Sequence, residues 1–178
     1  MNDDNAKRAR MLLSAPEIDD EVVALMNDLG PEGAKAVFAA ARDKEKALPA
    51  KERAHAVELL ARAGEIEDTD LHKLAADSAP TVRRHALLAL QDRRRTDLLL
   101  ESLQHKELDA TDHAIVLQAL ARIGNVAQVK GTLEWAVELT DPDIRNLAAT
   151  ALRTMRNRPE ADDDIDDLDR LVQEFRQP

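Results

Sequence analysis

The chain repeats itself at intervals of about 30 residues. The apolar pair at residues 59 and 60 recurs at 89 and 90, at 119 and 120 and at 151 and 152, in steps of 30, 30 and 32 residues. A second marker agrees, because LARAG at residues 60–64 returns as LARIG at residues 120–124. A period of this size is typical of stacked two-helix units, none of which buries its apolar face alone. The repeat therefore predicts an all-α chain of about four helix pairs.

The composition is consistent with closely packed helices. Hydrophobic residues make up 44% of the 178 residues, but aromatic residues only 2%, so Ala, Leu, Val and Ile must build the core. The chain has no cysteine, which excludes disulfides, thiolate metal sites and a cysteine nucleophile. We find neither a signal peptide nor a long uninterrupted apolar run, so we expect a soluble cytoplasmic protein without a membrane segment.

The net charge of -10 is unevenly distributed. Residues 1–78 carry 11 Lys and Arg against 17 Asp and Glu, residues 79–158 carry 12 against 10, and residues 159–178 carry 2 against 8. The ends are therefore acidic and the middle is mildly basic. Because an acidic protein repels nucleic acid and anionic membranes at long range, either ligand would need a local basic patch.

Helical periodicity, proline and glycine place the elements along the chain. Pro49, Pro80 and Pro142 stand at predicted helix starts, and Gly64 and Gly124 stand where a left-handed C-cap residue belongs. The first helices of the pairs are expected at residues 31–46, 69–77, 95–105 and 125–139, and the second helices at 50–63, 80–91, 110–123 and 142–155.

The segments that flank the repeats are predicted to be caps within the same single domain. Residues 1–30 contain two helical segments, 3–13 and 17–29, which we expect to cover one end of the array at 31–156. Residues 157–178 are strongly acidic and have one apolar helical stripe, which predicts a capping helix at the other end.

A basic column recurs in the second helices at Arg53, Arg83, His113 and Arg145. Together with this column, DPDIRNLAATAL at residues 141–152 and APTVRRHALLAL at residues 79–90 resemble the second helix of a HEAT repeat. The short period is more similar to the HEAT-like repeats of bilin lyases. The resemblance implies a right-handed superhelix of about four helix pairs that serves as a binding scaffold. It also implies a structural role for Arg83 and Arg145.

No motif for catalysis or for metal binding is present. Ser14, Ser78 and Ser102 lack the glycine-flanked turn of a nucleophilic serine, and none of the five histidines belongs to an HExxH motif. The aspartate cluster at residues 162–169 lacks the central glycine of an EF-hand and its final glutamate. We therefore expect no enzyme activity, no metal and no cofactor.

The outward face of the second helices is the candidate binding site. Helical geometry assigns Leu87, Leu88 and Leu117 to this face, and an exposed apolar strip with a polar rim usually marks a contact surface. Alternatively, a terminal cap covers these leucines, or the face is rotated by one residue. Val57 also falls on this face, and the predicted partner-binding residues are Glu58, Arg84, Leu87, Leu88, Gln91, Leu117, Gln118, Asn146, Thr150 and Arg153.

Three classes of function follow from these features. The first is a non-enzymatic adaptor that binds a protein partner along this face, oriented by Glu58, Arg84 and Arg153. The alternative is a nucleic-acid or phosphate binder that uses the arginines at 83, 84, 93, 94 and 95. The third class is an enzyme of the bilin-lyase or glycosylase kind, which would need polar groups that converge in a pocket.

Overall fold

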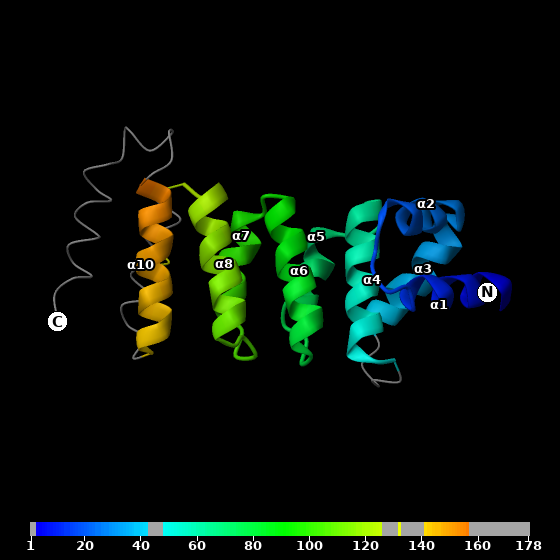
Figure 1. The fold of residues 1–178 in the computed structure, drawn as a ribbon, viewed down its shortest axis with the longest axis horizontal. Coiled ribbons are helices and arrows are strands. Elements are labelled where there is room, and N and C mark those ends of the chain that lie inside the picture. The colour runs from blue at the N-terminus through cyan, green and yellow to red at the C-terminus, as the bar shows by residue number, and fades with distance from the viewer. Residues whose placement is uncertain (1–2, 43–47, 126–131, 133–140, 157–178) are drawn as a thin grey trace. The chain divides into compact units, whose positions relative to one another are not determined.

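The computed structural model describes residues 3–42, 48–125, 132 and 141–156, and within these ranges the chain forms helices and no strands (Figure 1). The predicted all-α class is confirmed. The helix predicted at 125–139 lies almost wholly outside the described residues. The acidic segment at 157–178 and its aspartate cluster also lie outside them.

The chain divides into two compact units, Met1–Leu90 and Gln91–Pro178. The first unit holds nearly all of α6 (Pro80–Asp92) together with five earlier helices: α1 (Asp3–Leu13), α2 (Asp20–Asp28), α3 (Gly30–Ala41), α4 (Ala50–Ala63) and α5 (Asp68–Leu74). The described helices of the second unit are α7 (Thr96–Ser102), α8 (Ala110–Ile123) and α10 (Pro142–Arg156). None of the helices that the structure describes is long and apolar enough to cross a membrane.

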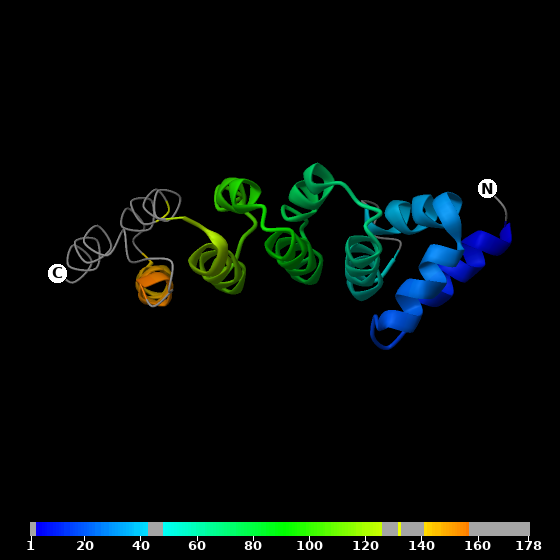
Figure 2. The same ribbon diagram turned by 90° about the horizontal axis from the view of Figure 1, so that it is seen from above.

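In the first unit, α1, α2 and α3 pack on one another, and each of them contacts α4. Leu13, Met26 and Val37 are buried in this part of the core. His55 of α4 adds a polar tie, since its Nδ1 donates a hydrogen bond of 3.1 Å to the carbonyl of Leu13. Within this unit α4 and α6 run side by side, and α5 lies across one side of them (Figure 2).

In the second unit, α8 packs against both α7 and α10. The two long helices lie side by side, and the shorter α7 lies on one side of α8 (Figures 1 and 2). Leu99, Leu120 and Leu152 are buried, one from each helix.

The predicted bounds of the second helices are confirmed to within one residue for α4, α6, α8 and α10. Pro49 is the N-cap of α4, while Pro80 and Pro142 are the first residues of α6 and α10. Three of the first helices, α3, α5 and α7, are shorter than predicted. α5 ends at Leu74 instead of residue 77. Asp77 lies beyond this end, where its carboxylate accepts from Arg53 of α4 and its backbone carbonyl accepts from Arg83 of α6.

α8 begins without a proline and uses a capping box. Asp109 Oδ1 accepts hydrogen bonds from the backbone N–H groups of Thr111 and Asp112, at 2.9 and 3.0 Å. The carboxylate of Asp112 in turn accepts a hydrogen bond of 3.1 Å from the N–H of Asp109. These bonds satisfy N–H groups that have no partner inside the helix, so they fix where α8 starts.

The two glycines that end second helices act differently. Gly64 has φ of 75° and closes α4 in a Schellman motif, in which Glu65 N donates to the carbonyl of Leu60 at 2.9 Å. Gly124 has φ of -77°, so the prediction of a left-handed cap there is wrong. A Cβ at residue 124 would lie 2.6 Å from the carbonyl oxygen of Leu120, and this close approach is what requires glycine.

Replacing Gly64 with Ala is expected to lower the free energy of unfolding by about 1 kcal/mol, because the left-handed region is unfavourable for residues with a Cβ. Gly64→Asn should cost less, since asparagine tolerates this region. At Gly124 both Ala and Asn should be destabilising, because any Cβ meets the carbonyl of Leu120. Urea denaturation followed by circular dichroism measures these free energies of unfolding. An asparagine that is tolerated better than alanine at both positions would contradict the steric explanation for Gly124.

Candidate functional site

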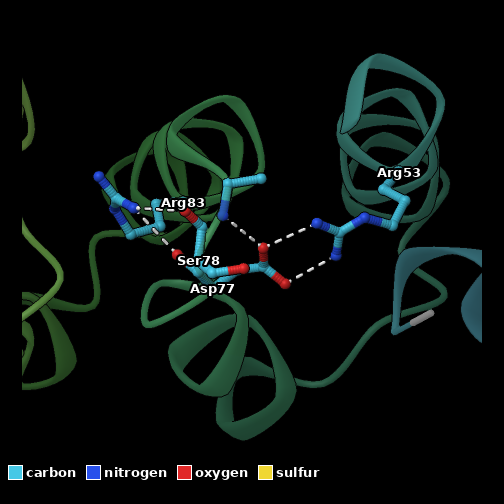
Figure 3. A network of polar contacts seen from close by, with 5 residues as sticks. Arg53, Asp77, Ser78 and Arg83 are labelled. Carbon is cyan, nitrogen blue, oxygen red and sulfur yellow. Dashed lines mark hydrogen bonds and ion pairs between the residues drawn. The ribbon is translucent and has the colours of Figure 1, made fainter. Parts of the chain in front are cut away.

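A buried ion pair connects α4 to the loop before α6. Arg53 is 3% exposed and donates two hydrogen bonds to the carboxylate of Asp77, at 2.7 and 2.9 Å (Figure 3). Two parallel bonds of this kind hold both groups in one geometry, and burial of the arginine keeps water from screening the pair. The pair therefore fixes the distance between α4 and the start of α6.

Asp77 and Arg83 organise the rest of this connection. Asp77 Oδ1 also accepts a hydrogen bond of 2.8 Å from the N–H of Ala79, just before α6 begins. Arg83 is buried and donates to the carbonyls of Asp77 and Ser78, at 3.0 and 3.3 Å (Figure 3). The structural role inferred for Arg83 is confirmed, and Arg53 shares it. Arg145 is exposed on α10, so its structural role stays a prediction.

The exposed apolar strip predicted on the second helices is largely wrong. Leu87 is 0% exposed and Leu117 is 2% exposed, and Val57 is also buried. Buried residues of α6 occupy positions 82, 83, 86, 87, 89 and 90, which span an arc of about 160° at a rotation of about 100° per residue. Because neighbouring elements cover this wide arc, Leu87 and Leu117 belong to the core and contribute to stability instead of to partner binding.

The true outward column of these helices is narrower. It contains Glu58, Leu88, Gln118 and Thr150, which occupy equivalent positions in the repeat and are partly or fully exposed. Leu88 is the large apolar member and is 42% exposed. Only one leucine of the predicted strip is therefore available to a partner.

Around Leu88, the outward face of the first unit carries a charged network. Glu58 of α4 lies 3.4 Å from Nε2 of His85 and 3.7 Å from the guanidinium of Arg62. Arg62 also forms an ion pair of 2.5 Å with Asp20 of α2 and donates to the carbonyl of Ile18. Glu58 was predicted to orient a partner, but its carboxylate already connects α4 to α6 through His85. The partners Arg62 and His85 were missed, although both lie one helical turn from predicted face residues.

Apart from the buried Leu117, the predicted site residues of the second unit are polar. Gln118 of α8 is exposed, as are Asn146, Thr150 and Arg153 on α10, while Gln91 is half-buried. The hydroxyl of Thr150 donates to the carbonyl of Asn146 at 2.9 Å. This surface offers hydrogen-bonding groups on two helices that pack together, but among the described side chains it has no large exposed apolar residue.

The arginines of the predicted basic cluster lie in different local surroundings. Arg83 is buried, and Arg95 binds Asp97 through bonds of 3.0 and 2.6 Å. Arg94 has φ of 57°, which turns the chain between α6 and α7. The arginines at 93, 94 and 95 therefore do not lie along one helix face.

Two of the histidines form hydrogen bonds to carbonyls four residues earlier in the chain. His85 Nδ1 donates to the carbonyl of Thr81 and His113 Nδ1 to that of Asp109, each at 2.8 Å. Across the ranges that the structure describes, no group of three histidine or acidic side chains is arranged to hold a metal ion.

Breaking the buried ion pair should destabilise the protein strongly. Asp77→Ala and Arg53→Ala are each expected to lower the free energy of unfolding by about 3 kcal/mol, since each leaves a buried charge or polar group without its partner. The double variant should lose much less than the sum. Urea denaturation measures this, with Glu17→Ala as a control at an exposed carboxylate. A loss below about 1 kcal/mol for Asp77→Ala would contradict a buried ion pair.

The contact between Arg95 and Asp97 should depend on pH. Hydrogen bonds from Arg95 hold the pKa of Asp97 below its usual value of 3.8. A lowered pKa in the folded state means that the contact stabilises the fold above 3.8 and loses this effect as the pH falls through the folded-state pKa. Asp97→Asn should cost at most about 0.5 kcal/mol at neutral pH, because the pair is exposed. The difference from wild type in urea denaturation should vanish in acid, and a difference that grows in acid would refute the assignment.

Comparison with protein-family models, with curated proteins and with solved structures finds no match to this chain.

Proposed function

We propose that the chain is a non-enzymatic scaffold that binds a protein partner on the outward face of α4 and α6. The observation that carries this proposal is Leu88, a large apolar side chain that is 42% exposed on a well-packed helix. Arg84 and His85 lie within one helical turn of it, and His85 contacts Glu58 of α4. An apolar side chain within a polar rim is the usual arrangement at the centre of a protein contact.

The packing beneath this face supports recognition without rearrangement. Leu87 and Leu90 anchor α6 in the core, and Arg53 and Asp77 tie α4 to the loop that starts α6. A rigid surface loses little conformational freedom when a partner binds, which favours affinity from a small contact. The outward face of the first unit is therefore suited to act as a preformed platform.

The proposal also includes the arrangement of the helix pairs. The 30-residue period and the HEAT-like sequence features suggest that the helix pairs form a right-handed superhelix with terminal caps, as in binding scaffolds. In this proposal the protein acts in the cytoplasm. Gln118, Asn146, Thr150 and Arg153 would then supply polar contacts to the same partner.

Nucleic-acid or phosphate binding has less support. A phosphate backbone needs several available cations, whereas Arg83 is buried and Arg95 is bound to Asp97. The net charge of -10 also opposes long-range attraction to a polyanion.

A photo-crosslinking amino acid tests the proposed surface. Placed at position 88, it should form a discrete crosslink to a protein in the native host. Placed at position 25, where Leu25 of α2 is 48% exposed, it should not form the same crosslink. The variant Leu88→Asp with Arg84→Glu should lose the partner in affinity purification, and Leu25→Asp should retain it.

Two results would reject this function. Unchanged recovery of the partner with the Leu88→Asp and Arg84→Glu variant would exclude the proposed face. Gel-shift binding to nucleic acid that weakens steeply as salt rises would instead favour the alternative.

A further inference from the structure

A groove lies in the first unit, apart from the face that carries Leu88. It has a volume of about 320 Å³ and is formed by α3, the loop between α4 and α5, and the start of α5. Ala34, Phe38 and Ile66 form its apolar floor, and Glu65, Glu67 and Asp70 lie along its edge. No predicted site residue belongs to it.

The floor is suited to a single apolar side chain. Ala34 and Ile66 are buried, and Phe38 is partly exposed toward the groove. The guanidinium of Arg42 lies 5.4 Å from the centre of the Phe38 ring, and this cation–π contact helps to hold the ring in place. The volume is at the lower limit of sites that enclose whole small molecules, so one inserted side chain fits it better than a cofactor.

The charge at the edge of the groove is negative and poorly compensated. Lys35 lines the groove but is bound to Glu32 at 2.6 Å, and this hydrogen bond lowers the pKa of Glu32. Asp70 is paired with Lys73 at 2.9 Å. Glu65 and Glu67 are exposed, and neither carboxylate forms an ion pair with any residue in the described part of the chain.

We propose that this groove binds a basic peptide segment of a partner protein. One apolar side chain of the segment occupies the floor at Phe38 and Ile66, and flanking Lys or Arg side chains pair with Glu65 and Glu67. Carboxylates at the edge repel phosphates, so nucleic acid and anionic lipid surfaces are excluded as occupants. This site is additional to the Leu88 face and does not depend on it.

Fluorescence polarisation with short labelled peptides tests the proposal on the full chain. The probes carry a central Leu or Phe flanked on both sides by Lys and Arg, and a matched probe of equal charge carries Ser at the centre. The Leu and Phe probes should bind about tenfold more tightly than the Ser probe, because only they bury an apolar side chain. Equal binding of all probes would mean attraction by charge alone and would overturn the proposal, as would no binding of any probe.

Charge-reversal variants locate the site. Glu65→Lys with Glu67→Lys should weaken binding of the Leu probe at least about tenfold at physiological ionic strength. The control Glu17→Lys with Glu107→Lys makes the same change in net charge at exposed positions outside the groove and should leave binding unchanged. Equal losses in the two variants would overturn the proposal.

The same measurement separates the two surfaces. Leu88→Asp with Arg84→Glu should bind the Leu probe like the wild-type chain, since neither residue lines the groove. A loss of probe binding in this variant would place the peptide on the outward face and refute the groove.

Discussion

The bidentate contact between Arg53 and Asp77 is the interaction on which the first unit depends. It joins a helix to a loop 24 residues further along the chain, in surroundings where a lone charge would be costly. Because the same carboxylate receives the N–H of Ala79, and Arg83 binds the carbonyls beside it, one aspartate determines both where α6 begins and how it lies against α4. A salt bridge of this kind contributes little net stability over an apolar contact, but it specifies one arrangement.

That arrangement decides which side chains remain for binding. α6 is covered over a wide arc, so Leu87 enters the core while Leu88, one residue later, stays partly exposed. A rotation of about 100° per residue is enough to separate the two roles. The outward column is consequently mixed in character, with Glu58, Leu88, Gln118 and Thr150 at equivalent positions.

Charge divides the surface of the first unit into two kinds of site. Near Leu88, the carboxylate of Glu58 forms an ion pair with Arg62 and contacts the imidazole of His85. At the groove of α3 and α5, Lys35 is bound to Glu32 and Lys73 to Asp70, while Glu65 and Glu67 form no ion pair with the described residues. The first surface suits an apolar contact with local hydrogen bonds, and the second suits a cationic ligand.

The sequence by itself determined the helical class, the 30-residue period, the bounds of α4, α6, α8 and α10 and the Schellman cap at Gly64. These features depend on residues close together in the chain: proline at a helix start, glycine at its end and apolar spacing within one helix. The basic column was also visible, and the resemblance to HEAT repeats implied a structural role for Arg83. Only the tertiary structure decided that Leu87 and Leu117 are buried and that Asp77 is the partner of Arg53. It likewise showed that glycine is required at residue 124 because a Cβ there would meet the carbonyl of Leu120. It also brought together the residues of the groove, which come from segments that no local pattern connects. Exposure depends on how much of a helix its neighbours cover, and a single helix does not encode how many neighbours it will have.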